Sequence, residues 1–219
     1  MRAQSVASPR HEHRLPALAA VAVALTLYLL IPVKVQIVPI WVVPTIGLLL
    51  LIPLVVLNPR RFTRETVWSR RLSIVLATFL TVANQITVIF TVALLLDGKE
   101  KGSAVLLTAG QVWLTNVIAF SLVYWELDRG GPVARRDDSL WRTQEIDFRF
   151  PQNDGAPGNQ EWRPVFLDYA YFALTNMMAF SPTDVMPMTV RAKMLMAYQS
   201  LTGYILLALV ISRAVNILT

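Results

Sequence analysis

The chain has 219 residues, of which 55% are hydrophobic and 16% charged, and its mean hydropathy is +0.51. Because an ordinary soluble domain carries about 25% charged residues, this composition excludes a typical soluble domain. The absence of cysteine excludes disulfides, thiolate metal sites and cysteine nucleophiles. The net charge of +6 comes mostly from Lys and Arg that flank apolar blocks. This pattern indicates a membrane topology signal and no nucleic-acid partner.

Five apolar stretches predict transmembrane helices, at residues 15–33, 37–57, 72–96, 104–125 and 194–218. Each is close to the ~20 residues with which a helix spans a hydrocarbon layer. The first stretch is too long for a cleaved signal peptide and leads directly into the second, so we interpret it as a retained helix. The sequence therefore predicts an all-α, multi-pass protein of the cell membrane, in contact with its lipids.

The part before residue 98 is expected to be peripheral to any functional centre. Residues 1–14 form a polar tail that we expect to be disordered. Its two histidines, His11 and His13, are too few for a metal site, and we expect no metal or other cofactor. Residues 15–97 then supply three peripheral transmembrane helices. The arginine-rich loop after the second helix, residues 58–71, is interpreted as a topology anchor and alternatively as an anionic-lipid site.

Polar residues recur within the third and fourth apolar stretches. They either line a wet path or make hydrogen bonds between helices, and we favour the second interpretation. They are Thr78, Thr81, Asn84, Gln85, Thr87, Thr91, Gln111, Thr115, Asn116 and Ser121.

Residues 126–164 form the long aqueous segment, rich in Gly, Pro and both charge signs, with a short strand expected near 146–150. The apolar run that follows, residues 165–180, is too short for a full crossing and predicts a half-helix that enters the membrane and turns back. Its non-helical exit must lie in protein or in a water-filled vestibule, because lipid leaves such backbone unpaired.

The order of these elements, together with a run of residues after position 170, resembles the pore domain of tetrameric potassium-type channels. The residues that carry the resemblance match the family pattern without a gap and are Tyr171, Phe172, Asp184, Pro187 and Thr189. The resemblance implies a homotetramer in which residues 104–218 form a pore-like domain. Its parts would be an outer helix (104–125), a pore helix (165–180), a filter-like loop (181–189) and an inner helix (192–218) hinged at Gly203. The chain also resembles a family of bacterial membrane proteins with the same helix order and a similarly altered filter.

The selectivity filter of the potassium-channel family is absent. Where the family has Thr-Val-Gly-Tyr-Gly, this chain has Ala179, Phe180, Ser181, Pro182 and Thr183. Left-handed backbone at Ser181 and Thr183 would cost about 1–2 kcal/mol each. The Pro182 ring also pushes the preceding residue towards extended geometry. We therefore expect no standard potassium-selective cage.

Two functions remain open. In the first, Ser181, Thr183 and a ring of Asp184 line a cation-permeable channel of weak selectivity, with ions as the transported partner. In the alternative, the protein is a non-conducting membrane scaffold or regulatory subunit that keeps the channel fold. Short-loop basic residues favour a cytoplasmic N-terminus, whereas the potassium-channel resemblance favours the opposite orientation.

Enzymatic activity is not expected, because the sequence has no phosphate-cradling Gly-rich loop, no paired-histidine motif and no Gly-x-Ser-x-Gly elbow. Six of the seven methionines lie between Met177 and Met196. Thioethers bind Cu(I), but without accompanying Cys or His residues we interpret these methionines as adaptable packing residues.

Overall fold

The computed structural model describes residues 12–31, 39–57, 67–97, 102–141, 143–154, 162–178 and 184–218. Within them the protein is all-helical apart from one two-stranded sheet. The helices are α1 (Leu15–Leu29), α2 (Val42–Leu57), α3 (Val67–Asp97), α4 (Gly102–Leu127), α5 (Asp138–Trp141), α6 (Phe166–Met178) and α7 (Val190–Leu218), and the strands are β1 (Phe148–Arg149) and β2 (Met186–Pro187). The predicted all-α class is confirmed, and β1 lies within the range predicted for a strand.

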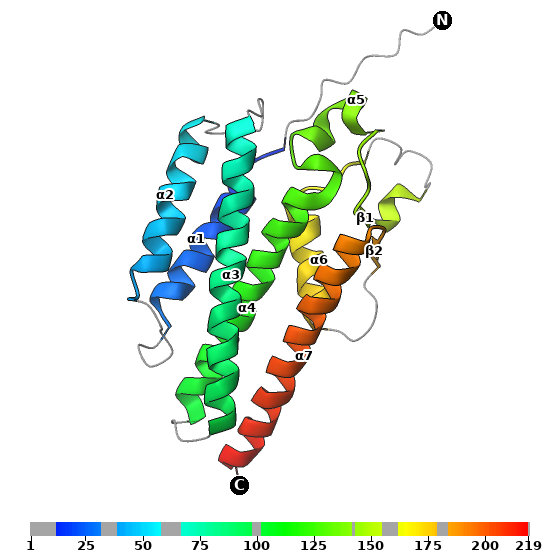
Figure 1. The fold of residues 1–219 in the computed structure, drawn as a ribbon. Coiled ribbons are helices and arrows are strands. Elements are labelled where there is room, and N and C mark those ends of the chain that lie inside the picture. Colours follow the sequence, from blue (N-terminus) through cyan, green and yellow to red (C-terminus); the bar gives the residue numbers. More distant parts are fainter. Residues whose placement is uncertain are drawn as a thin grey trace, which may run out of the picture.

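The long helices lie side by side, and α6 occupies the space between α4 and α7 (Figure 1). Residues 128–154, which we call the headpiece, sit at the end of the bundle where α4 ends and α7 begins. There β1 pairs antiparallel with β2, with Phe148 opposite Pro187. The headpiece is thus attached to the segment that follows α6.

Three helices are long and apolar enough to cross a membrane, at Trp68–Asp97, Ala104–Gly130 and Val190–Val215. The helices α1 and α2 are also apolar but have only 15 and 16 residues. At about 1.5 Å per residue they are shorter than the ~30 Å hydrocarbon layer. Three of the five predicted crossings therefore have the necessary length, and crossing by α1 and α2 stays a prediction.

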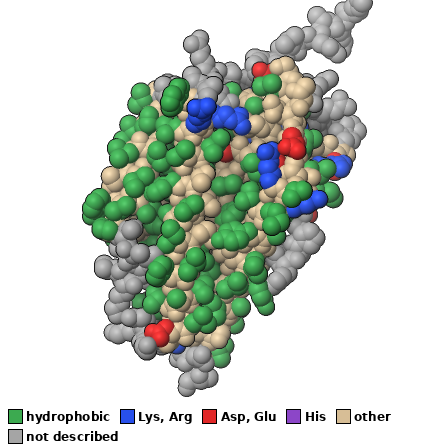
Figure 2. Space-filling view, in the orientation of Figure 1, with side chains coloured by type: hydrophobic (Ala, Val, Ile, Leu, Met, Phe, Trp, Pro, Cys, Tyr) green, Lys and Arg blue, Asp and Glu red, His purple; other side chains and the backbone are tan. Residues whose placement is uncertain are grey.

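The outward surface of the long helices is apolar, as Figure 2 shows. Two tryptophans on it are strongly exposed. Trp68, in the first turn of α3, is 77% exposed, and Trp41, just before α2, is 60% exposed. Tryptophan is enriched where membrane meets water, so exposed tryptophans beside apolar helices fit a membrane protein.

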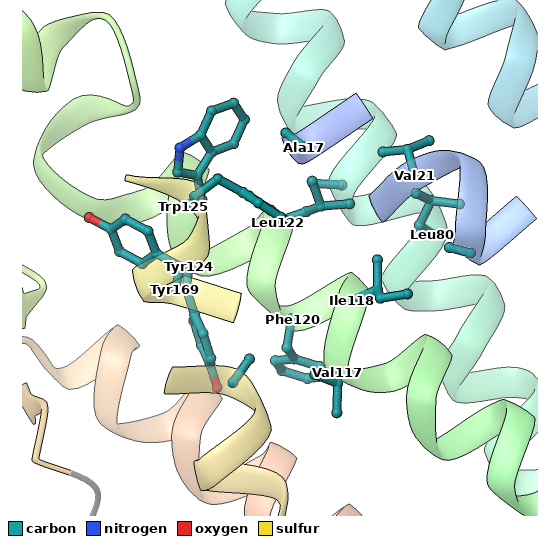
Figure 3. Close-up of a cluster of buried hydrophobic side chains, with 14 of the residues drawn as sticks. Ala17, Val21, Leu80, Val117, Ile118, Phe120, Leu122, Tyr124, Trp125 and Tyr169 are labelled. Carbon is teal, nitrogen blue, oxygen red and sulfur yellow. The ribbon is translucent and has the colours of Figure 1, made fainter. Parts of the chain in front are cut away.

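The core is organised around α4, which packs against α1, α3, α6 and α7. Figure 3 shows Ile118 and Leu122 of α4 beside side chains of α1 and α3, namely Ala17, Val21 and Leu80. On its other side, Tyr124 of α4 contacts Phe148 of β1 and Phe172 of α6, with ring centroids 5.0 and 4.8 Å apart. One helix thus joins the peripheral helices to the headpiece and to α6.

Asparagine and threonine side chains inside the bundle differ in their hydrogen-bond partners. Asparagine bonds between helices: Asn116 Nδ2 of α4 donates to Asn84 Oδ1 of α3 at 2.9 Å, and Asn84 Nδ2 donates to the Val112 carbonyl at 3.1 Å. Threonine instead bonds back to its own helix, as Thr87 does to the Ala83 carbonyl at 2.9 Å. The predicted interhelical role is therefore confirmed for the asparagines, whereas the Thr87 hydroxyl donates within its own helix, because a β-hydroxyl easily reaches the preceding turn.

The predicted disordered tail, residues 1–14, is wrong for its last three residues, and residues 1–11 lie outside the described part. Glu12 and Arg14 are each 4% exposed. Arg14 donates to the Leu54 carbonyl at the end of α2, and Glu12 reaches α4 and α6. Their partners are 40 to 154 residues away in the chain, so no local pattern could have revealed them.

Candidate functional site

The short helix α6 enters the bundle from the headpiece end and stops halfway along it. It has 13 residues, which at about 1.5 Å each extend about 20 Å. Its last turn lies against the middle of α7, where Asn176 and Met177 contact Ser200 and Gly203. The chain is described again from Asp184 and pairs as β2 with the headpiece. The segment therefore returns to the end from which it entered.

A buried hydrogen-bonded cluster holds the carboxyl end of α6. Gln199 of α7 is its centre: its Oε1 accepts from Tyr124 OH of α4 and from Asn176 Nδ2 of α6, each at 2.7 Å. Gln199 Nε2 donates to the Ala173 carbonyl of α6 at 3.0 Å. Ser200 Oγ donates to Asn176 Oδ1 at 2.9 Å. Because α6 ends inside the bundle, side chains of α7 replace the water that would otherwise satisfy this end of the helix.

Close backbone packing adds to this cluster at Gly203. A Cβ atom at Gly203 would lie 2.4 Å from the Met177 carbonyl oxygen, which is closer than real Cβ contacts allow. Only glycine therefore lets α7 approach the last turn of α6 this closely. Gly203, predicted as an inner-helix hinge, lies within the continuous helix α7 and acts here as a contact residue.

The amino end of α6 is held by two carboxylates. Glu12 Oε1 accepts from the Phe166 amide at 2.7 Å, and Asp168 Oδ2 accepts from the Val165 amide at 2.7 Å. Acidic groups at this position satisfy free N–H groups and face the positive end of the helix dipole. The first turn of α6 is thus fixed as firmly as its last.

Asp128, at the end of α4, joins α6 to the headpiece. Its Oδ2 accepts from Tyr169 OH of α6 at 2.5 Å, and its Oδ1 accepts from the amides of Asp147 and Phe148 at 3.1 and 3.2 Å. Arg135, fully buried, lies with its guanidinium carbon 4.9 Å from the centre of the Tyr169 ring. The Asp128 carboxylate, the Arg135 guanidinium and two headpiece amides therefore meet beside the turn of α6 that carries Tyr169.

Asp147 makes the equivalent junction with the segment that returns from α6. Its carboxylate accepts from Arg191 through Nε and Nη2, each at 2.7 Å, and from Thr189 Oγ1 at 2.5 Å. Its carbonyl accepts from the Met188 amide at 2.8 Å. A bidentate pair of this kind fixes orientation as well as distance. Asp147 thereby sets where α7 begins.

The predicted filter-like residues lie mostly outside the described part of the chain. Ala179, Phe180, Ser181, Pro182 and Thr183 are in that group. Asp184 is described and exposed at the headpiece end. Asp184 lies just before β2. Gly203, which lies farther along the chain in α7, contacts the last turn of α6.

The residues that sequence reasoning missed are the buried acids Glu12, Asp128 and Asp147. All three stand in segments of mixed charge, which usually are solvated. Their burial depends on donors supplied by distant segments, so the composition of their surroundings carried no signal. Within the described residues, no group of three or more His, Asp or Glu side chains is arranged to hold a metal ion.

Comparison with protein-family models, with curated proteins and with solved structures found no match to this chain.

The contact at Gly203 predicts a large difference between two glycine substitutions. Gly203→Ala should destabilise the protein by about 1–3 kcal/mol, because the new methyl group overpacks against Met177. Gly110→Ala is the matched control, since no atom lies within 4 Å of a Cβ there, and it should stabilise α4 by about 0.5–1 kcal/mol. Thermal unfolding in detergent measures both. Equal stability of the two variants would contradict the close approach of α6 and α7.

Gln199→Leu should lower stability by about 1–3 kcal/mol, since it leaves the buried Tyr124 hydroxyl without its acceptor. Gln85→Leu makes the same chemical change at a partly exposed bond to Tyr198 and should cost less than about 1 kcal/mol. Denaturant or thermal unfolding of the two variants tests the difference, and a larger effect at Gln85 would show that the cluster does not hold α6.

Proposed function

We propose that the protein is a pore-loop membrane protein that assembles as a homotetramer in the cell membrane and conducts cations with weak selectivity. The observation that carries this proposal is the geometry of α6. A short helix that enters the bundle, ends beside the middle of α7 and returns to the same end is the arrangement that presents a loop to a central axis.

An exposed stripe on α6 supports assembly. Leu167, Tyr171 and Met178 are 61%, 62% and 63% exposed, and their spacing of four and seven residues places them on one face of the helix. Unpaired backbone groups at the end of a helix cannot face lipid, because lipid offers no hydrogen-bond partners. Further copies of the chain would cover this face. The number four comes from the resemblance to tetrameric potassium-type channels.

The charges near the loop favour cations. The carboxyl end of α6 carries the negative end of the helix dipole into the interior of the bundle. Asp184 follows the loop and is exposed, so four copies would place four carboxylates at one mouth. Acidic rings of this kind favour cations in channels.

Charge also supports an orientation. The described Lys and Arg residues belong to segments at the headpiece end, apart from Arg213 near the end of α7. Because cytoplasmic segments carry an excess of Lys and Arg, we place the headpiece and the chain ahead of α1 in the cytoplasm. The loop after α6 would then enter from the cytoplasmic side, opposite to its direction in potassium channels.

The conduction proposal predicts ion flux in liposomes that contain the purified protein. Asp184→Asn should lower cation flux several-fold or reduce the preference for cations over chloride, because it removes the acidic ring. Asp138→Asn is the control: Asp138 is an exposed headpiece acid whose side chain is 88% accessible, and its loss should leave flux unchanged. A tetramer that passes no ions under several ionic conditions would reject conduction and support the non-conducting scaffold instead.

The assembly proposal is tested by cross-linking, for which the cysteine-free chain is well suited. In Tyr171→Cys, a short bifunctional thiol reagent should link chains into species of up to four copies, because the stripe on α6 faces neighbouring copies. Ile89→Cys introduces an equally exposed site, 64% accessible, on α3, and should remain monomeric on a denaturing gel. Cross-linking at position 89 with none at position 171 would place the assembly surface on α3 and contradict the proposal.

A further inference from the structure

The segment ahead of α1 inserts one carboxyl group into the junction of α4, α6 and the headpiece. Glu12 is 4% exposed. Its Oε1 accepts from the Phe166 amide of α6 at 2.7 Å and from Trp125 Nε1 of α4 at 3.0 Å. Its Oε2 lies 3.9 Å from Arg136 Nη2 of the headpiece and accepts no hydrogen bond from the described residues. Both donors therefore serve one oxygen and leave the other without an N–H partner.

The first turn of α6 needs the Glu12 carboxyl because no side chain at the start of the helix accepts from the Phe166 amide. Val165, directly before the helix, has no side-chain oxygen with which to cap the Phe166 amide. The acceptor comes instead from a residue 154 positions earlier in the sequence. The Glu12 side chain is thus a separable part of the α6 junction, held on the segment ahead of α1, which Arg14 also fixes to the Leu54 carbonyl of α2.

The ionisable groups that face Glu12 come from each element around it. Arg135 and Arg136 of the headpiece attract its negative charge, and Tyr169 of α6 lies within range. Asp168 occupies the first turn of α6 beside it. His13, which is exposed, and Arg14 flank Glu12 on its own segment. The two arginines attract the ionised form and so oppose the effect of burial.

Burying an ionised carboxylate with one unpaired oxygen is costly, and protonation of that oxygen removes the charge while Oε1 keeps both of its donors. We propose that the segment ahead of α1 is a detachable cap for α6: Glu12 docks on the helix start when its carboxyl is protonated and is released as it ionises. Proton uptake at one residue would then fix or free the first turn of α6. This does not depend on whether the loop conducts ions.

The pKa of the Glu12 carboxyl is shifted in the direction that the proposal requires. Burial raises the pKa of the Glu12 carboxyl, and the attraction of Arg135 and Arg136 only partly offsets that rise. A carboxyl whose pKa is higher when docked than when free binds its proton more tightly in the docked state. Docking is therefore most stable below the ordinary Glu pKa of about 4.3, and it weakens as the pH rises through the higher pKa of the docked carboxyl.

A fluorescent label beside Glu12 tests the proposal in the full-length protein in lipid nanodiscs. His13→Cys supplies a unique exposed thiol for bimane, whose emission tryptophan quenches on contact, and it also removes a competing titratable group. With Glu12 docked, Trp125 donates to the residue next to the label. We expect strong quenching at acidic pH and loss of quenching at higher pH, with the slope of a single proton. A Trp125→Phe companion identifies the quencher and gives the unquenched signal.

Two substitutions at Glu12 test whether its carboxyl causes the pH-dependent change in quenching. Glu12→Gln keeps an oxygen acceptor and cannot ionise, so its quenching should stay high at every pH, whereas Glu12→Ala should stay unquenched. A pH-independent signal with Glu12 in place would overturn the proposal, as would an unchanged transition in Glu12→Gln. Should Glu12→Ala fail to fold, the comparison of Glu and Gln decides alone. Ion flux is not part of the measurement, so failure here leaves the channel proposal standing.

Discussion

The structure depends on satisfying the backbone of a short helix inside an apolar bundle. The 13 residues of α6 end beside the middle of α7, within the length of the bundle. Gln199 and Ser200 provide donors there, and Gly203 allows the close approach that brings them within reach. Without these contacts the same sequence would gain by leaving the bundle or by extending into a full crossing.

Three buried carboxylates extend this principle to the headpiece end. Glu12 binds the first amide of α6, Asp128 binds the Tyr169 hydroxyl, and Asp147 binds Arg191 at the start of α7. Asp128 also accepts from the amides of Asp147 and Phe148, so two of the three acids are directly linked. The start of α6 and the start of α7 therefore share one support, and a displacement of the headpiece would move them together.

Much of the helix pattern could be predicted from the sequence, because apolar length is a strong signal. The third, fourth and last apolar stretches correspond to α3, α4 and α7, and the short run after Pro164 corresponds to α6 within two residues at each end. The first two stretches gave weaker results, since α1 and α2 are shorter than predicted. Proline explains part of this difference, because Pro39 lies before α2 and Pro53 lies within it.

The contacts that hold the site could not be predicted in the same way. Tyr124, Asn176 and Gln199 are each unremarkable in their local sequence and become a cluster only when α4, α6 and α7 pack together. Glu12 looked like part of a solvated tail because its partners lie more than 110 residues away. Periodicity reports which face of a helix is buried, whereas pairing between distant polar groups depends on the three-dimensional arrangement.

The long sequence separation between Glu12 and Phe166 also bears on how the chain matures. A ribosome delivers the Glu12 carboxyl 154 residues ahead of the amide that it serves. The junction therefore cannot close until α6 has been made, and contacts of such large sequence separation form slowly. Closure of the junction would then be a late step of biogenesis, in which the newly made α6 meets a segment that was synthesised long before it.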